Sequence, residues 1–239
     1  MKQHPPPGPE QEAPAPPRVA NEVFGDRLPL ARRFAELLAG DGVTQGVIGP
    51  RETPRLWERH LLNCAVVEVM LPHRTRVIDL GSGAGLPGIV LALARPDLEL
   101  YLVEPMLRRT KWLSQVVDEL GLGNVRILRG RAQDVRGQVR TPVVTARAVA
   151  RTRELVEWAF PLLEPGGRLL ALKGVSAEEE LAEDRASFAP WPVDSAQVHR
   201  LGEDLLEEPT RVIEVVASSA ALPGSPVRGR RGASRRAGR

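Results

Sequence analysis

The feature that most constrains this chain is a short apolar run that leads directly into closely spaced glycines. Residues 77–80 read Val-Ile-Asp-Leu, and Gly81, Gly83 and Gly85 follow at every second position. A β-branched apolar run of this length predicts a buried strand. Glycine has no Cβ and tolerates positive φ, so the loop can bring its backbone N–H groups close to a ligand. The pattern predicts a strand, a ligand-binding loop and then a helix.

The rest of the chain indicates the sheet to which this strand belongs. From residue 75 on, β-branched apolar runs alternate with helical segments, which is typical of a parallel sheet wrapped by helices. We therefore expect an α/β fold with a seven-stranded, mostly parallel sheet whose last two strands form a hairpin-like pair. The strands are expected near 76–80, 98–104, 124–129, 142–147, 167–173, 195–201 and 210–217, and the helices near 86–95, 106–121, 152–163 and 176–188.

Composition and periodicity divide the chain into four segments. The first seventeen residues hold seven prolines and almost no large apolar groups, so we expect a disordered Pro-rich arm over 1–20. Apolar residues then recur at helical spacing, which predicts N-terminal helices within 21–74. The α/β core follows over 75–218. An Arg-rich tail, also expected to be disordered, forms residues 219–239.

The charge of the chain is distributed unevenly. The last twelve residues hold six arginines, so the remainder carries a net charge of −3 although the whole chain carries +3. A basic block of this kind is typical of an electrostatic arm that binds nucleic acid or another polyanion. The alternative is a solvated tail without a specific partner.

Several classes of protein are disfavoured by composition. No apolar stretch approaches the roughly 20 residues that a membrane-spanning helix needs, and the N-terminus lacks the order of a secretory signal. Cys64 is the only cysteine, and the four histidines are scattered, so neither a disulfide framework nor a zinc site is expected. We expect a cytoplasmic protein without a metal. The sequence does not determine the oligomeric state, and a monomer is the default expectation.

Two carboxylates beside the glycine loop narrow the choice of ligand. Asp79 ends the first strand, where it can pair with the cationic amino-acid portion of S-adenosylmethionine directly or through water. Glu104 closes the second strand, 23 residues after Gly81, and can accept hydrogen bonds from both ribose hydroxyls. NAD enzymes also place an acid there, so a dinucleotide-binding dehydrogenase is the rival interpretation. The final strand pair and Asp79 favour the methyl donor. The alternatives are that Asp79 only caps the next turn and that Glu104 is solvated.

The loop after the third strand is the next candidate for ligand contact. Residues 130–134 read Gly-Arg-Ala-Gln-Asp and lie where such folds line an adenine pocket. Backbone and side-chain amides in this loop can read the edge of the ring. A plain loop without ligand contact is the alternative.

The stretch from Asp79 to Gly88, Asp-Leu-Gly-Ser-Gly-Ala-Gly-Leu-Pro-Gly, resembles the RsmG family, also called GidB, of bacterial 16S rRNA guanine-N7 methyltransferases. Its extension through Leu-Pro-Gly makes the motif specific. The resemblance covers about residues 24–218. Further matching strings are Arg59-His-Leu-Leu-Asn63, Arg109-Thr-Lys-Trp-Leu113, Ala146-Arg-Ala148 and Ala171-Leu-Lys-Gly174.

The resemblance implies a class I Rossmann-like methyltransferase with an N-terminal helical extension. The implied methyl donor is S-adenosylmethionine, and the implied acceptor is N7 of a guanine in a loop of 16S rRNA of the small ribosomal subunit. One departure is Asn63-Cys64, where many members carry Asp-Ser, so an amide replaces a carboxylate at position 63 and cannot supply its charge. The implied cofactor positions are Gly81, Leu86, Glu104, Pro105, Met106, Ala132, Gln133 and Arg147.

The chemistry of such an acceptor agrees with the residues after the fourth strand. Guanine N7 is already an unprotonated nucleophile, so methyl transfer requires alignment rather than a general base. Residues 145–148 read Thr-Ala-Arg-Ala, where methyltransferases of exocyclic amines carry an Asp/Asn-Pro-Pro-aromatic run. The chain also lacks the Pro-Cys nucleophile of the cytosine-C5 enzymes. Both competing chemistries are therefore disfavoured.

Two basic residues are candidates for positioning the substrate. Arg147 and, with lower priority, Lys173 follow predicted strands and can hydrogen-bond the guanine O6 edge or a flanking phosphate. The alternative for each is a structural ion pair. His60 lies on an otherwise apolar helix face, and we assign it no acid–base role. A small-molecule or protein methyltransferase of the same fold and a noncatalytic cofactor-sensing module are the remaining functional alternatives.

Overall fold

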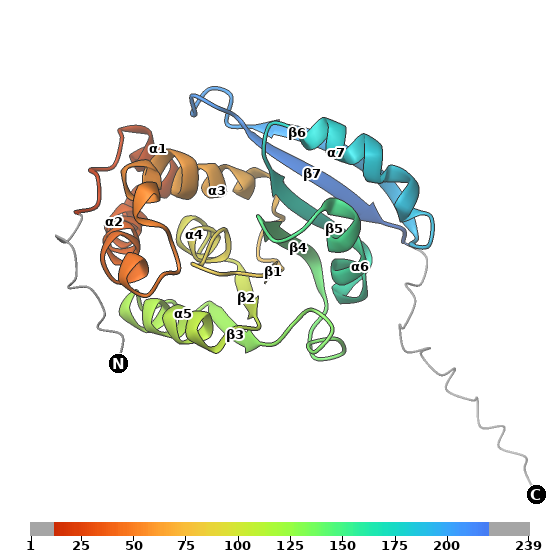
Figure 1. The fold of residues 1–239 in the computed structure, drawn as a ribbon, viewed down its shortest axis with the longest axis horizontal. Helices are drawn as coiled ribbons and strands as arrows, with labels where there is room; N and C mark the ends of the chain where they lie inside the picture. The colour runs from red at the N-terminus through yellow and green to blue at the C-terminus, as the bar shows by residue number, and fades with distance from the viewer. Residues whose placement is uncertain (1–11, 220–239) are drawn as a thin grey trace, which may run out of the picture.

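The strand that leads into the glycine loop lies near the centre of the sheet. The computed structural model describes residues 12–219, and seven strands form one sheet in the order β3-β2-β1-β4-β5-β7-β6. The first five strands in sequence are parallel, β7 is antiparallel to β5, and β6 is antiparallel to β7 (Figure 1). The predicted fold class is confirmed. The strands are β1 (Arg76–Leu80), β2 (Glu99–Glu104), β3 (Val125–Arg129), β4 (Thr141–Arg147), β5 (Leu163–Lys173), β6 (Val193–Leu201) and β7 (Thr210–Ala217).

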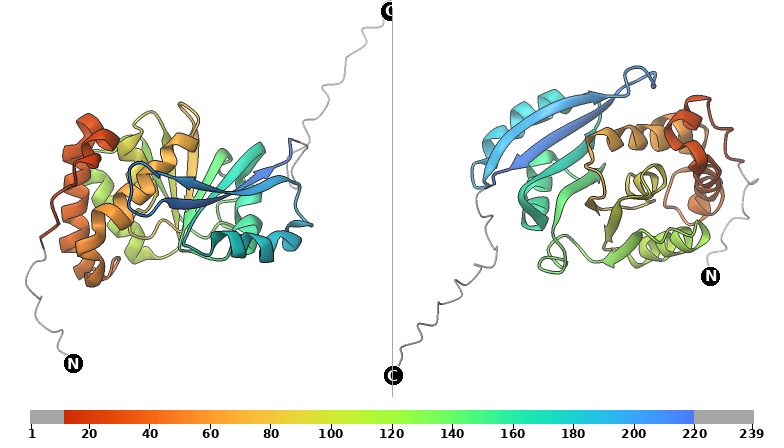
Figure 2. Two further views of the ribbon diagram at one scale, coloured as in Figure 1. Left: turned by 90° about the horizontal axis from the view of Figure 1, so that it is seen from above. Right: turned by 180° about the vertical axis from the view of Figure 1, so that it is seen from behind.

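Helices cover both faces of the sheet and bury two apolar layers. One layer joins the N-terminal helices, α4 and α5 to the sheet, and the other joins α6 and α7 to the opposite face. Figure 2 shows α1 and α2 together at one end of the molecule and α7 at the other. Burial of these apolar side chains is the main favourable contribution to folding. The helices of the core are α4 (Gly88–Ala94), α5 (Leu107–Glu119), α6 (Thr152–Ala159) and α7 (Ala177–Asp184).

The N-terminal helices differ from the prediction in their regularity. Residues 50–70, in the region predicted to hold N-terminal helices, follow a helical path but change their hydrogen-bonding pattern several times. This helical stretch begins at Pro50, and Pro54 lies inside its first segment. None of the helices within residues 12–219 is long and apolar enough to span a membrane. The elements are α1 (Val19–Phe24), η1 (Gly25–Arg27), α2 (Leu28–Leu37), η2 (Leu38–Gly42), η3 (Pro50–Arg55), η4 (Leu56–Leu62), α3 (Asn63–Ala65) and η5 (Val66–Met70).

The predicted disordered arm needs a correction over residues 12–20. Helix α1 begins at Val19, and Ala13 packs against the apolar layer of the N-terminal helices. The indole N–H of the buried Trp57 donates to the carbonyl of Pro14 at 2.8 Å. A buried indole requires an acceptor, and proline retains its carbonyl although it lacks an N–H, so a Pro-rich segment can dock here. Residues 1–11 and 220–239, which hold most of both predicted tails, lie outside the described residues.

A completely buried carboxylate determines the shape of the turn between β1 and α4. The Asp79 side chain accepts the backbone N–H of Gly88 at 3.1 Å and the hydroxyl of Thr145 on β4 at 3.0 Å. The Ser82 hydroxyl donates to the Asp79 carbonyl at 2.9 Å. Burial raises the pKa of Asp79 to about 7, although these hydrogen bonds favour its charged form. The carboxylate thereby ties the start of α4 to the sheet.

Gly88 is required because the sheet lies directly against the first turn of α4. A Cβ at this position would lie 2.3 Å from Cδ2 of Leu102 and 2.8 Å from Oδ2 of Asp79. Real Cβ atoms do not approach other atoms so closely, so the buried Leu102 and Asp79 side chains or the helix itself would have to shift. The close approach also keeps the Gly88 N–H within reach of the buried carboxylate.

We predict that Gly88→Ala destabilises the protein by about 1–3 kcal/mol, the usual cost of overpacking a dense core. Urea unfolding at neutral pH measures the change. Gly40→Ala is the matched control, since Gly40 also lies in helical backbone but has no atom within 4 Å of its added Cβ. Equal stability of the two variants would contradict the packing argument.

We also predict that Asp79→Asn weakens the pH dependence of stability. Because the folded-state pKa of Asp79 is raised to about 7, its contribution is fully present below the unfolded pKa and is lost as pH rises through about 7. Asparagine cannot ionise, and its amide retains one acceptor for Gly88 and one donor for Thr145. The wild type should therefore lose more unfolding free energy than the variant between about pH 5 and about pH 8. Parallel stability curves would refute this assignment.

Candidate cofactor and substrate site

The parallel register brings the predicted site residues to one edge of the sheet. Leu80 at the end of β1 pairs with Val103 on β2 and with Ala146 on β4. Arg147 on β4 pairs with Leu172 on β5. The glycine loop, the end of β2, Arg147 and Lys173 consequently meet at the carboxyl ends of the strands, where open α/β sheets bind ligands.

Glu104 is buried and joins the glycine loop to the start of α5. Its side chain is 1% exposed, so the solvated alternative is wrong. One carboxylate oxygen accepts the N–H of Gly83 at 3.0 Å, and the other accepts the N–H of Met106 at 2.9 Å. The guanidinium of Arg109 lies 3.8 Å from the oxygen that faces Gly83. The acid that closes β2 thus connects the glycine loop to the segment that leads into α5.

A pocket of about 300 Å³ opens between these loops, and its wall is mostly apolar. Four residues predicted to bind the cofactor line it, namely Gly81, Pro105, Ala132 and Gln133. Its size and lining suit a flat ring system, while the amide of Gln133 offers the ring edge a donor and an acceptor. The complete lining is Leu80, Gly81, Val103, Pro105, Gly130, Arg131, Ala132, Gln133, Val149 and Trp158.

The other predicted cofactor positions shape the site without lining this pocket. Asp79 is completely buried and accepts from Gly88 and Thr145, so the structure favours the alternative that it stabilises the turn over direct contact with a cofactor. Gly85 has a φ of +100°, and a Cβ there would lie 2.6 Å from Cγ1 of Ile89. Leu86 is partly buried against the N-terminal apolar layer, whereas Met106 is 46% exposed beside the pocket.

Sequence reasoning missed Val149 and Trp158 as pocket residues. Val149 follows the Ala-Arg-Ala string after β4, and its side chain lies over the glycine loop. A Cβ added to Gly81 would lie 2.7 Å from Cγ2 of Val149, and Gly81 has a φ of +69°. Ala148 itself has a φ of +54°, which is uncommon for a residue with a side chain. The position of Val149 over Gly81 follows this unusual backbone conformation at Ala148. The sequence around Ala148 contains no residue type that would have predicted a positive φ there.

Arg147 is held by three neutral acceptors from the N-terminal helices. Its guanidinium donates to the Cys64 sulfur at 3.0 Å, to the carbonyl of Arg59 at 2.9 Å and to Nδ1 of His60 at 2.8 Å. Within residues 12–219 no carboxylate lies within ion-pair distance of Arg147, so the structural ion-pair alternative is not supported. The side chain is fixed, but its charge is not neutralised by the protein.

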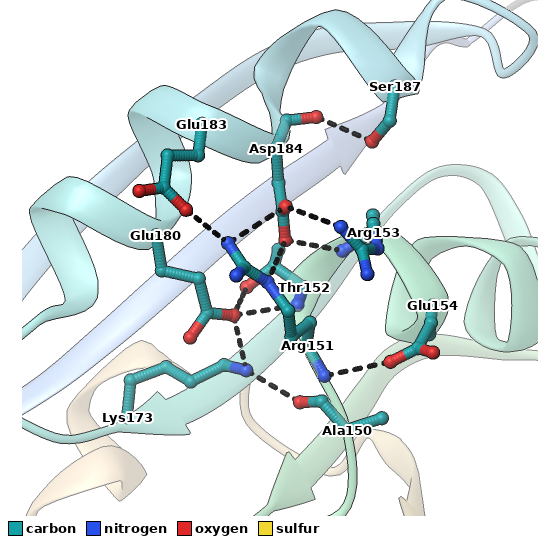
Figure 3. Close-up of polar contacts among 10 residues, drawn as sticks. All are labelled: Ala150, Arg151, Thr152, Arg153, Glu154, Lys173, Glu180, Glu183, Asp184 and Ser187. Atoms are coloured by element: carbon teal, nitrogen blue, oxygen red, sulfur yellow. Dashed lines mark hydrogen bonds and ion pairs between the residues drawn. The ribbon is translucent and has the colours of Figure 1, made fainter.

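Lys173 has a different environment, shown in Figure 3. Its ammonium lies 2.7 Å from a carboxylate oxygen of Glu180 on α7 and donates to the carbonyl of Ala150 at 2.8 Å. The same Glu180 oxygen accepts both the N–H and the hydroxyl of Thr152 at 2.7 Å. The structure therefore favours the ion-pair alternative for Lys173 over the predicted contact with substrate.

Further ion pairs attach the start of α6 to α7. The buried Asp184 lies 3.1 Å from the Arg151 guanidinium and accepts the backbone N–H of Arg153 at 3.1 Å. Glu183 also pairs with Arg151, at 2.7 Å (Figure 3). Together with Lys173, these contacts fix the backbone immediately after the loop that carries Val149.

Asn63, the departure noted in the sequence, performs a structural role. Its side-chain amide donates to the Thr210 hydroxyl at 2.7 Å, and that hydroxyl donates to the Asn63 carbonyl at 3.0 Å. The pair connects α3 to the first residue of β7. The neighbouring Cys64 instead contacts Arg147. Asn63 and Cys64 therefore have different partners, the first on β7 and the second at the end of β4.

Comparisons with known proteins agree with this geometry. The family model for rRNA small subunit methyltransferase G matches residues 27–207. The protein named ribosomal RNA small subunit methyltransferase G in Thermobifida fusca is 54% identical over 207 residues, which cover 87% of each chain. The protein of that name in a Nocardioides strain is 52% identical over 232 residues, which cover 95% of this chain and 93% of the relative.

Solved structures at lower identity share the fold. A SAM-dependent O-methyltransferase from Thermotoga maritima is 14% identical, with a TM-score of 0.50 over 66% of this chain and 65% of that one. TYW2 from M. jannaschii in complex with AdoMet is 15% identical, with a TM-score of 0.50 over 67% and 76% of the two chains. The sequence match is the stronger result, because the family model spans the glycine loop, the strands β1 to β6 and most of the N-terminal helices. The chain belongs to the rRNA small subunit methyltransferase G family.

Proposed function

We propose that this protein transfers a methyl group from S-adenosylmethionine to N7 of a guanine in a loop of 16S rRNA of the small ribosomal subunit. The observation that carries the proposal is the pocket beside the glycine loop, in a chain that matches rRNA small subunit methyltransferase G over residues 27–207. We also propose that the protein acts as a monomer in the cytoplasm, where ribosomal subunits are available.

The described residues suit an adenosine-containing donor. The apolar pocket would hold the adenine ring between Pro105 and Ala132, with the Gln133 amide at its edge. Glu104 stands at the end of β2, and an oxygen that accepts one N–H retains a lone pair for a ribose hydroxyl. When bound, S-adenosylmethionine supplies an electrophilic methyl group on its sulfonium. The protein supplies the shape and polarity that orient it.

The acceptor chemistry fits a site without a free general base. Asp79 is enclosed, Glu104 is hydrogen-bonded to two backbone N–H groups, and the Lys173 ammonium is paired with Glu180. A guanine N7 lone pair needs no deprotonation, so alignment with the methyl group is the main requirement. Arg147 remains charged at the edge of the sheet and is suited to the guanine O6 edge, a phosphate or the carboxylate of the donor.

The substrate must present its base outside a regular helix. N7 lies on the edge that faces the deep major groove of A-form RNA, which side chains do not enter readily, so a loop nucleotide is required. Exposed Met106 and Leu107 lie at the start of α5 beside the pocket, and can contact a base that is turned out of its stack. The N-terminal helices and the Arg-rich tail are proposed to contact the RNA backbone.

We predict that labelled methyl from S-adenosylmethionine is incorporated by the purified protein into 16S rRNA or small subunits from a strain that lacks this activity. Mass mapping should locate the label at N7 of one loop guanine. Small subunits from the parent strain, which retains the activity and whose guanine is therefore already methylated, serve as the control and should take up no label. No incorporation into either substrate would refute the proposal, and label on an exocyclic amine would refute the assignment to N7.

We predict that Glu104→Gln weakens binding of S-adenosylmethionine by about 10- to 100-fold, as expected when a charge-assisted hydrogen bond is lost. In the wild type, one Glu104 oxygen accepts the N–H of Gly83 and the other accepts the N–H of Met106. The glutamine must therefore direct its NH₂ group at one of these two N–H groups. Glu99→Gln at the opposite end of β2 is the control. Calorimetric titration measures both affinities, and an equal small effect in the two variants would argue against this role for Glu104.

A further inference from the structure

A continuous chain of hydrogen bonds connects the N-terminal helices to Arg147. Glu52 on η3 lies 2.8 Å from Nε2 of His60 on η4, and Nδ1 of the same imidazole lies 2.8 Å from the Arg147 guanidinium. His60 and Arg147 are 87 positions apart in the sequence. The imidazole thus bridges an acid on the helical extension and the arginine at the end of β4.

The chemistry of the partners determines the tautomer of His60. A guanidinium can only donate hydrogen bonds, so Nδ1 must be unprotonated and accept. Nε2 must then carry the proton, which it donates to the Glu52 carboxylate. Burial and the nearby Arg147 charge lower the pKa of His60 to about 4, which agrees with a neutral ring at physiological pH. Glu52 therefore orients the imidazole so that its acceptor faces Arg147.

Among the three acceptors of Arg147, His60 is the one whose side chain can restrain the guanidinium most strongly. The Cys64 sulfur is a weak acceptor, and the Arg59 carbonyl belongs to the backbone and is present with any side chain. His60 provides the stronger of the two side-chain acceptors, and its side chain is only 11% exposed. A neutral imidazole restrains the guanidinium without neutralising its charge.

We propose that His60, oriented by Glu52, is a positioning residue that holds the Arg147 guanidinium at the methyl-transfer site. This inference rests on the proposed function and gives the N-terminal helical extension a part in the reaction. His60 exchanges no proton with the substrate. It fixes the direction in which the remaining N–H groups of the Arg147 guanidinium point. Within residues 12–219 this guanidinium has no carboxylate partner.

Two replacements of His60 separate positioning from packing. In His60→Asn the amide oxygen can occupy the place of Nδ1 and still accept from Arg147, although the contact with Glu52 is lost. In His60→Gln the amide reaches the place of Nε2, which keeps the contact with Glu52 but removes the acceptor for Arg147. We expect His60→Asn to retain kcat/KM for rRNA methylation within about threefold, and His60→Gln to lose about tenfold or more.

A second measurement follows the guanidinium itself. Nitrogen-15 NMR of the Arg147 side chain, assigned with Arg147→Lys, should show restricted rotation in the wild type and in His60→Asn, and averaged signals in His60→Gln. This readout needs neither RNA nor methyl transfer. If the wild type methylates no rRNA, the proposed function fails, and the NMR comparison still decides whether His60 holds Arg147.

A double-mutant cycle completes the test. In an Arg147→Ala background, replacement of His60 by Gln should have almost no further effect on kcat/KM, since the residue that it positions is gone. His199→Gln is the matched control, because His199 also pairs with a glutamate, Glu214 at 2.9 Å, but on the β6–β7 hairpin. It should leave methyl transfer unchanged. Additive effects of the Arg147 and His60 changes, or equal activity of the Asn and Gln variants, would overturn the inference.

Discussion

The buried Asp79 carboxylate is the interaction on which the geometry of the site depends. It joins three elements, since the residue lies on β1 and accepts from Thr145 on β4 and from Gly88 at the start of α4. An unpaired charge at this depth would be strongly unfavourable, so the surrounding donors must remain in place whenever the carboxylate is ionised. Glu104 acts in a similar way on the other side of the loop, through Gly83 and Met106. Contacts within the protein therefore hold the backbone of the loop in place, which lowers the entropy cost of ligand binding.

The sheet and the glycine loop could be predicted because their signals are local. β-Branched runs and regularly spaced glycines specify backbone conformation within a few residues, and the observed strands agree closely with the predicted ranges. The sequence left Lys173 open between a substrate contact and an ion pair, because its partner Glu180 is identified only when α7 packs on the sheet. The docking of Pro14 likewise depends on Trp57, which is 43 positions away. Composition alone indicated disorder there, because it does not include tertiary hydrogen bonds.

The contacts of Asn63 and Cys64 explain how the chain accommodates its departure from the Asp-Ser of many family members. An aspartate at position 63 would place an acceptor beside the Thr210 hydroxyl, which already donates to the Asn63 carbonyl, whereas the amide supplies the complementary donor. The amide therefore satisfies both groups without a charge. Cys64 accepts from Arg147 as a serine hydroxyl also can, so the thiol preserves the contact in a weaker form.

These contacts also explain the different environments of the two basic residues at the edge of the sheet. Lys173 has a carboxylate partner, and it serves to fix the backbone that leads from the Val149 loop into α6. Arg147 has only neutral acceptors, so the protein holds its position while leaving its charge available. A ring nitrogen that needs no deprotonation is methylated at a rate set mainly by alignment. The proposed chemistry therefore calls for one restrained cation and a rigid loop rather than a proton acceptor, and the contacts of Arg147 with the N-terminal helices supply such a restraint.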